Sequence, residues 1–404
     1  MKLLIAIIIF CVSFGANAQE QSCTSTFSNS TGLETAVASA ANGSVICLNS
    51  GSYGSVSFNG ITGRTGFVTV RSTSGRGATI SPQVVNSRYI RFRNLTINDM
   101  LIQACSQNIQ VVNNTWVQDT SGISVYNYGF GCPGATDSKI VIDGNNFTNT
   151  RPSWSEGKIG IVEVNGVILR NNLIQGQSTN NGGDGIQTGG SLNNVIIGPG
   201  NHFKNIRQAP CESTPGAPHC DAIQFVSDCP NCQIIGNWFD DVEVVLQHHD
   251  ATTPVIFKNN LITNAVQMWC YSTPGSCSNA VIDHNTFYNV SNFISWGMTG
   301  GGVSDTTGLV ARNNILIGTT VGPATCNTPS CTFTNNLCQT SGQCSFNTTN
   351  TTIATPTFVG GAPASITTWG GWKLAPGSAG KGTATDGLDR GTTYFSPGPV
   401  GGFN

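Results

Sequence analysis

Short alternating apolar runs recur along most of the chain, and each is followed by one or two Asn or Gly residues and then by another apolar residue. Alternation of apolar and polar positions predicts short β-strands, and Asn or Gly between them predicts a tight bend. The segments recur at intervals of roughly 20 to 36 residues, which is typical of one supersecondary unit in a repeat protein. The pattern therefore predicts a solenoid. The segments are IRFRNLTI, IQVVNNTW, IVIDGNNF, VILRNNLI, VIIGPGNHF, QIIGNWF, VIFKNNLI, AVIDHNTF, LVARNNIL and CTFTNNLC.

The bend in each unit requires a residue that tolerates left-handed backbone angles, and Asn and Gly share this property. In stacked coils such Asn residues also form a ladder whose amides bond one another along the axis. We therefore interpret one set of Asn residues as structural. The set is Asn145, Asn171, Asn201, Asn237, Asn259, Asn285 and Asn313.

Three consecutive coils, GDGIQT, CDAIQF and EVVLQH, align on their strands. Because successive side chains of a strand point to opposite faces, one residue of each strand should stack in the interior and the next should stack outside. Ile186, Ile223 and Leu246 form the expected interior stack. The expected surface ladder, with a role in substrate binding, consists of Gln187, Gln224 and Gln247.

Ionisable residues gather on the same coils. Asp184 and Asp221 open two of the strands, and parallel strands lie about 4.8 Å apart, so their carboxylates should be neighbours. The pKa of one should rise unless a cation lies between them. An Asp at a strand entrance also caps turns by accepting backbone amides, so a purely structural role is the alternative. The further catalytic candidates, with His219 as a substrate-binding candidate beside Asp221, are His248, His249 and Asp250.

Basic and aromatic residues flank this cluster. The segment bracketed by Cys211 and Cys220 predicts a disulfide-tied loop beside the site, and such loops often form groove walls. Basic residues near it are candidates for binding a carboxylated substrate, although solvated turns explain them equally well. Aromatic rings of the following coils suit sugar rings. The substrate-binding candidates of these two kinds are Lys204, Arg207, Trp269 and Tyr271.

The N-terminus predicts export. MKLLIAIIIFCVSFGANAQE carries one Lys, an apolar run and a small-x-small cleavage pattern, which together predict a signal peptide over residues 1–18. No later segment has the apolar length of a membrane span. Of the 15 cysteines, Cys11 lies in the signal peptide and 14 remain, so we expect disulfides and a secreted protein. We interpret Cys229 and Cys232 as a structural disulfide rather than a redox or zinc motif.

Composition narrows the class further. Only 9 % of the residues are charged and the net charge is −2, which argues against nucleic-acid and membrane partners. The 49 glycines and the scarcity of helix formers favour an all-β chain. We expect a monomer with the repeats over 19–354 and a Gly/Pro-rich tail, 355–404, that wraps the last coils. Glycosylation sequons, which would mark surface turns, occur at Asn29, Asn94, Asn113, Asn146, Asn289, Asn347 and Asn350.

These features resemble those of right-handed parallel β-helices of the pectate-lyase-like superfamily. The opening LETAVASAANGSVICLNSGSYGSVSF is similar to their capping helix and first coil, and WKLAPGSAGKGTATDGLDRG is similar to a last coil and cap. The resemblance implies an all-β, single-stranded solenoid with an N-terminal cap and a C-terminal wrapping tail. It also implies an enzyme that acts on a polysaccharide.

Two reaction types compete under this resemblance. In a lyase, acidic side chains, often through Ca²⁺, neutralise a uronate carboxylate while a base removes the proton at C5. Asp184, Asp221 and Asp241 would then bind the metal or the carboxylate. The base would be His249, Lys204 or Arg207.

In an inverting hydrolase, Asp184 and Asp221 would supply the acid and the base, since NGGDGIQ and HCDAIQF look like strands of polygalacturonases. The chain lacks the second Asp, the Gly-His-Gly and the Arg-Ile-Lys of that family. A C5-epimerase is a cousin of the lyase, and a glycan-binding or adhesin β-helix without catalysis is the alternative from another class. We expect lyase chemistry on an acidic polysaccharide first.

Overall fold

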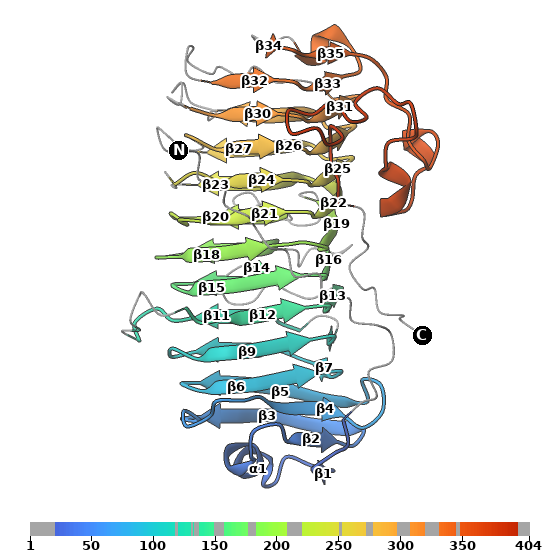
Figure 1. Cartoon of the computed structure of the whole chain (residues 1–404). Coiled ribbons are helices and arrows are strands. Elements are labelled where there is room, and N and C mark those ends of the chain that lie inside the picture. The colour runs from blue at the N-terminus through green and yellow to red at the C-terminus, as the bar shows by residue number, and fades with distance from the viewer. Residues whose placement is uncertain are drawn as a thin grey trace.

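The chain forms a parallel β-helix, as the repeat predicts. The structure is a computed structural model, and it describes residues 21–117, 120–130, 132, 137–148, 157–176, 183–207, 220–249, 253–271, 278–296, 308–319, 331–344 and 348–394. Figure 1 shows the coils stacked in sequence order from the blue N-terminal end to the orange C-terminal end. Every pair of strands along the three ladders described next is parallel.

Three ladders of strands make up three faces, which we call A, B and C in chain order within a coil. Face A consists of β1 (Ser25–Phe27), β2 (Val45–Leu48), β4 (Val68–Ser72), β6 (Arg88–Arg93), β9 (Gln107–Val112), β12 (Ile140–Asp143), β15 (Asn165–Arg170), β18 (Asn193–Ile197), β21 (Gln233–Ile235), β24 (Ile256–Lys258), β27 (Val281–Asp283), β30 (Val310–Arg312), β32 (Thr332–Thr334) and β34 (Thr348–Thr349).

Two long strands, β3 (Gly51–Asn59) and β5 (Ala78–Val85), start the other two faces, and β5 pairs with the first strand of each. Face B consists of β7 (Thr96–Ile97), β10 (Thr115–Trp116), β13 (Asn146–Thr148), β16 (Leu173–Gln175), β19 (His202–Ile206), β22 (Trp238–Val242), β25 (Leu261–Thr263), β28 (Thr286–Tyr288), β31 (Ile315–Ile317), β33 (Leu337–Cys338) and β35 (Thr352–Ile353). Face C consists of β8 (Met100–Gln103), β11 (Ile123–Tyr126), β14 (Gly157–Val162), β17 (Asp184–Gly189), β20 (Ile223–Phe225), β23 (Val244–His249), β26 (Gln267–Tyr271) and β29 (Asn292–Trp296).

The corner between faces A and B is built from two positions in succession, the first an Asn, Gly or His and the second an Asn. The first has left-handed angles, as at Asn171 (φ 57°) and Asn259 (φ 56°). The second is buried and bonds along the axis: Asn172 Oδ1 accepts from the backbone N–H and the Nδ2 of Asn145 at 2.9 and 3.0 Å. The buried ladder is Asn114, Asn145, Asn172, Asn201, Asn237, Asn260, Asn285, Asn314 and Asn336.

The expected set of structural Asn residues therefore divides. Four belong to the buried ladder, namely Asn145, Asn201, Asn237 and Asn285. The other three, Asn171, Asn259 and Asn313, have the left-handed angles. Asn occurs at the two positions for different reasons. A positive φ requires a residue that tolerates left-handed backbone angles. A buried turn requires a side chain that both donates and accepts hydrogen bonds.

Both ends of the solenoid are covered by non-repeating chain. Helix α1 (Leu33–Ser39) buries Leu33 and Val37 against the N-terminal coils. At the other end come the 3₁₀ turns η1 (Ser341–Cys344), η2 (Pro363–Ser365) and η3 (Trp369–Trp372). The red tail runs back along the coils in Figure 1, and its Trp369 and Trp372 join a hydrophobic cluster with Trp238 and Leu261 of face B. The tail wraps the coils because its aromatic residues cover apolar side chains that point outward from face B.

A partly buried cluster of charged residues links the tail to face A. Asp283 Oδ1 contacts His284 Nδ1 at 2.7 Å and accepts from Asn313 Nδ2 at 3.0 Å, and Lys258 Nζ lies 3.4 Å from Asp283 Oδ2. His284 Nε2 lies 3.2 Å from Asp386 Oδ1 of the tail. Burial alone would raise the pKa of Asp283, but the hydrogen bonds and the nearby positive charges outweigh it and hold the pKa well below its usual range.

This cluster predicts loss of stability in acid. A folded-state pKa below the unfolded value contributes stability that is present above about pH 3.9 and is lost as the pH falls through the folded pKa. The urea midpoint should therefore fall between about pH 6 and about pH 3, and Asp283→Asn should lose less over that range. Asp99→Asn, at an exposed carboxylate, is the control and should keep the full acid dependence. An Asp283→Asn variant with the same acid dependence as the wild type would contradict the assignment.

The disulfides between described residues join positions that are 3 to 27 residues apart in the chain. The bonded pairs are Cys23–Cys47, Cys105–Cys132, Cys229–Cys232 and Cys338–Cys344. Cys220 is also disulfide-bonded, and Cys211, its expected partner, lies outside the described residues. The structural interpretation of Cys229 and Cys232 is confirmed. None of the helices in the described part of the chain has the length and apolar run needed to cross a bilayer.

Candidate active site

The three glutamines of face C form a continuous row. Gln187 pairs in register with Gln224, and Gln224 with Gln247. Gln187 Nε2 donates to Gln224 Oε1 at 2.7 Å, and Gln224 Nε2 donates to Gln247 Oε1 at 3.0 Å. The row was expected on the surface, but Gln247 is 0 % exposed and Gln224 is also buried. Burial is tolerated because each amide satisfies the next, while Gln247 Nε2, at the end of the row, has no acceptor within the described chain.

Asp184 and Asp221 lie on neighbouring coils at the corner where face B turns into face C. The backbone N–H of Asp221 donates to Asp184 Oδ1 at 2.8 Å, and Asp221 forms a parallel bridge with Val244. The two residues are therefore adjacent, as the strand alignment indicated. Asp184 is 3 % exposed and Asp221 is 0 % exposed. Asp184 thus caps the entrance of the next coil, which is the structural role that the sequence analysis gave as the alternative. The same hydrogen bond fixes the position of its carboxylate.

Lys158 is a functional candidate that the sequence analysis did not identify. It lies on β14 between Gly157 and Ile159, which pair in register with Asp184 and Ile186. The residue is 0 % exposed. Burial lowers the pKa of Lys158 to about 8, and the negative charge of Asp184 acts in the opposite direction. The available signal was a single Lys within the strand GKIGIV, in a chain with only 18 Lys and Arg residues.

His248 is buried in the same group of coils. It pairs in register with Phe225 and lies with its ring centroid 6.1 Å from that of Phe225. Burial lowers the pKa of His248 to about 4, against the charge of Asp228, so the ring is neutral at pH 7. A neutral, buried imidazole is suited to packing more than to acid chemistry at that pH.

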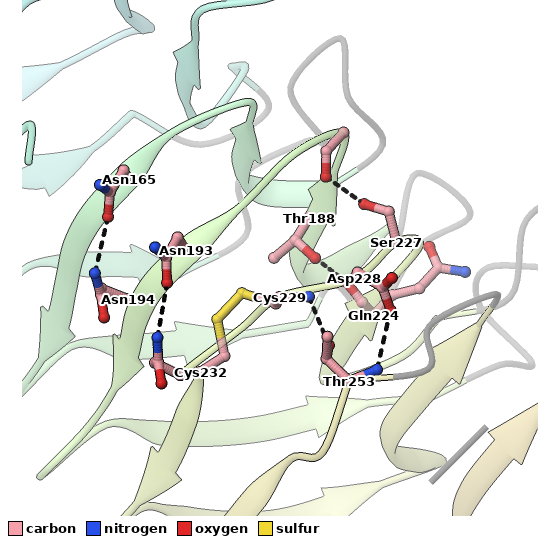
Figure 2. Close-up of a disulfide and its surroundings, with 12 residues drawn as sticks. Asn165, Thr188, Asn193, Asn194, Gln224, Ser227, Asp228, Cys229, Cys232 and Thr253 are labelled. Atoms are coloured by element: carbon pink, nitrogen blue, oxygen red, sulfur yellow. Dashed lines mark hydrogen bonds between the residues drawn. A yellow bond between two sulfur atoms is a disulfide. The ribbon is translucent and has the colours of Figure 1, made fainter. Parts of the chain in front are cut away.

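The corner after β20 is held by side-chain bonds that link three coils. The N–H of Thr253 donates to Asp228 Oδ1 at 3.0 Å, and the N–H of Cys229 donates to Thr253 Oγ1 at 2.9 Å. Figure 2 shows these bonds beside the disulfide, together with the bond of Thr188 Oγ1 to the Gln224 carbonyl. The strands that carry the Gln row and the aspartates thus end in a cross-linked edge.

Arg207 and Asp241 pair with each other. The Nε of Arg207 donates to Asp241 Oδ1 at 2.9 Å, and Nη1 lies 3.7 Å from Glu243 Oε2. Asp241 was expected to bind a metal together with Asp184 and Asp221, but here it neutralises an arginine. A guanidinium remains protonated in proteins, so Arg207 does not serve as the expected base.

Lys204 lies on face B, where it pairs in register with Asp240. Asp184 and Asp221 lie at the corner where face B turns into face C, and a role of Lys204 as their base stays a prediction. The remaining expected residues lie outside the description: His219 and Asp250 altogether, and the side chains of His249, Trp269 and Tyr271. Their roles stay predictions. The backbone of His249 pairs with that of Tyr271.

The described residues offer few ligands for the expected Ca²⁺. Across the described ranges, no three His, Cys, Asp or Glu side chains lie close enough to hold a metal ion. Asp184 and Asp221 supply two carboxylates, whereas Ca²⁺ takes six to eight oxygen ligands. The described residues therefore do not fit a Ca²⁺ site by themselves.

Comparison of the chain with protein-family models and with curated proteins gives no match. Solved structures do match. The PL6 family alginate lyase AlyGC shares 12 % identity over 93 % of this chain, with a TM-score of 0.59, and the match spans 57 % of AlyGC. The chain thus corresponds to a little over half of that protein.

Two other matches cover most of both chains. A mannuronic acid specific family 6 lyase from human gut microbiota has a TM-score of 0.53 and 12 % identity, with 82 % of each chain covered. A PL6 alginate lyase in complex with a trisaccharide has a TM-score of 0.53 and 10 % identity, with 93 % of this chain and 95 % of that chain covered. At these identities the matches establish the β-helix fold.

Proposed function

We propose that this protein is a secreted polysaccharide lyase that cleaves an acidic, uronate-containing polysaccharide by β-elimination. The observation that carries the proposal is Lys158, a buried amine of lowered pKa beside Asp184 on face C. The matched structures are lyases of such polymers, and the disulfides fit an exported protein.

In this proposal Lys158 is the base. Elimination transfers the C5 proton of the uronate to the base, forms the C4–C5 double bond and breaks the bond from C4 to the glycosidic oxygen, which then takes up a proton. A general base is most effective when its pKa lies near the working pH. Once protonated, the ammonium of Lys158 is stabilised by the carboxylate of Asp184.

The Gln row supplies the second requirement, which is stabilisation of the charge that builds up on the uronate carboxylate. Amide donors aimed at developing charge in a site shielded from water stabilise a transition state more than they would in water. Within the described chain, Gln247 Nε2 is the buried amide donor of the row that has no hydrogen-bond acceptor. It is therefore the donor proposed to bind the uronate carboxylate. His249, Asp250, His219, Trp269 and Tyr271 are proposed to bind the polymer around this centre.

Lys158 is covered in the structure, so the proposal requires that polymer binding exposes it. Hydrogen exchange of the backbone amides tests this requirement. The amides of β14 and β17 should exchange faster when a substrate polymer is added to a slow-cleaving variant such as Lys158→Met. Identical exchange with and without a polymer that the wild type cleaves would contradict face C as the site.

The pH dependence follows from the direction of the Lys158 shift. Only the neutral amine accepts a proton, so kcat/KM should rise with pH up to about 8, where the pKa of Lys158 lies, and level off above it. Initial rates of double-bond formation across this range test the assignment. A profile that falls over the same range would contradict Lys158 as base.

The first experiment separates lyase from hydrolase and from binding protein. Ultraviolet absorbance of unsaturated uronate and release of reducing ends are followed on pectate, alginate and related polymers, with and without Ca²⁺. Both signals together indicate elimination, whereas reducing ends alone indicate hydrolysis by Asp184 and Asp221. Binding with neither signal indicates a glycan-binding β-helix, unless the uronate configuration changes, as for an epimerase.

A further inference from the structure

A pocket lies on face B, where the C-terminal tail passes over the strands. The cavity has a volume of about 360 Å³. Its strand side carries His202, Lys204, Asp240, Thr263 and Tyr288, and its tail side runs from Pro363 to Trp372. Ligand pockets usually range from about 300 to 1,000 Å³, so this cavity is sized for a small ligand.

The strand side presents its polar groups in a row. Lys204, Asp240, Thr263 and Tyr288 pair in register on β19, β22, β25 and β28. Neighbouring members of such a row are about 4.8 Å apart along the axis. The cavity therefore offers an ammonium, a carboxylate and two hydroxyl-bearing side chains in a line, which is a pattern suited to a molecule with several oxygens.

Asp240 is held in place and charged. Trp238 Nε1 donates to Thr263 Oγ1 at 3.0 Å, and Thr263 Oγ1 donates to Asp240 Oδ1 at 2.9 Å. His202 Nε2 lies 3.9 Å from Asp240 Oδ2, and the His202 ring stacks on Trp238 with centroids 4.5 Å apart. Burial would raise the pKa of Asp240, but the contacts with His202 and Thr263 and the charge of Lys204 lower it. The carboxylate is thus fixed as an acceptor for hydroxyl groups.

Two donors at the cavity form no close ion pair or hydrogen bond in the described part of the chain. Lys204 forms no ion pair within 4.0 Å in the described part of the chain. Trp372 is 2 % exposed and lines the cavity, and its buried Nε1–H has no acceptor among the described residues. A buried donor without a partner is unfavourable, so a ligand oxygen that reaches this N–H would be stabilising.

We propose that this cavity binds an acidic saccharide, with its carboxylate on Lys204 and its hydroxyl groups between Asp240 and Trp372. An ammonium attracts the carboxylate, the fixed Asp240 accepts from sugar hydroxyls, and the indole N–H donates to a ring or hydroxyl oxygen. The choice of a uronate over other carboxylated molecules rests on the proposed function. The site is separate from face C and would hold a chain end or product beside the catalytic coils.

Uronate monosaccharides test the site because they contain no glycosidic bond to cleave. Galacturonate, mannuronate and guluronate, with neutral galactose for comparison, are titrated into the full-length protein and followed by ligand-observed NMR. Binding of at least one uronate should weaken about tenfold or more in Lys204→Met and in Asp240→Asn, since each removes a charge-assisted contact. Trp372→Phe should weaken it less, by about the loss of one hydrogen bond, or several-fold.

Lys139→Met is the matched control, since it removes the same charge from an exposed position near face A. It should bind as the wild type does, and thermal unfolding of each variant verifies that it is folded. Uronate affinity that is unchanged in folded Lys204→Met and Asp240→Asn, or absent in the wild type, would overturn the inference. Galactose binding as tightly as any uronate would overturn the role of Lys204.

The two proposals fail separately. A wild-type protein that cleaves uronate polymers but binds no uronate monosaccharide leaves the lyase proposal standing and overturns the face B site. Uronate binding that depends on Lys204, in a protein that cleaves no polymer, supports the face B site and overturns the lyase proposal.

Discussion

Asn260→Ala should lower the free energy of unfolding by about 2–6 kcal/mol, the largest effect on stability that we expect from a single side chain of the solenoid. The backbone N–H of Asn237 donates to Asn260 Oδ1 at 2.9 Å, and Asn260 Nδ2 donates to the Ile234 carbonyl at 2.9 Å. Both partner groups are buried, and alanine removes one hydrogen bond from each of them. Each such loss costs about 1–3 kcal/mol.

The denaturant midpoint measures this effect, and a second Asn provides the control. Asn289 has left-handed angles (φ 52°) but is exposed, so Asn289→Gly keeps the backbone conformation and removes no buried bond. It should shift the midpoint little. Equal shifts in the two variants would show that the ladder contributes no more than the turn conformation does.

Lys158→Met should reduce kcat/KM for elimination by about 10²-fold or more, which is the usual contribution of a general base. Methionine is apolar and of similar length, so it fills the buried position without the cost of an amine there. The variant should therefore fold at least as well as the wild type. A loss of activity would then report chemistry.

The assay is the initial rate of double-bond formation on the best polymer of the panel. Lys139→Met again serves as the control, because Lys139 is an exposed lysine, away from face C, and should keep the full rate. Asp184→Asn should also lower the rate, since it removes the charge that stabilises the ammonium. A Lys158→Met variant with wild-type turnover would exclude Lys158 as base and return that role to His249.

Periodicity alone was enough to predict the solenoid, because every coil repeats the same local rule. An alternating strand, a residue tolerant of left-handed angles and a second strand fix one corner, and stacking buries the apolar side of each coil. The register of Gln187, Gln224 and Gln247 follows from the same rule, since parallel strands of successive coils stack residue upon residue. The wrapping tail also followed from composition.

The sequence pattern did not predict that the Asn residues of a corner have two different roles. Asn171 and Asn172 are the same residue type in neighbouring positions, yet Asn171 has left-handed angles and Asn172 is buried in the amide ladder. The residue type does not distinguish the two roles. The turn of the corner, which buries Asn172 and not Asn171, decides them.

The sequence by itself determined a β-helix with the paired aspartates on adjacent coils, because strand periodicity and the 4.8 Å spacing of parallel strands are local properties. Only the tertiary structure decided what surrounds each charge. It placed Lys158 beside Asp184, paired Arg207 with Asp241, put Lys204 on another face and brought Trp372 over it. Desolvation and Coulomb interactions depend on distance in space, so residues far apart in the chain set the chemistry of the site.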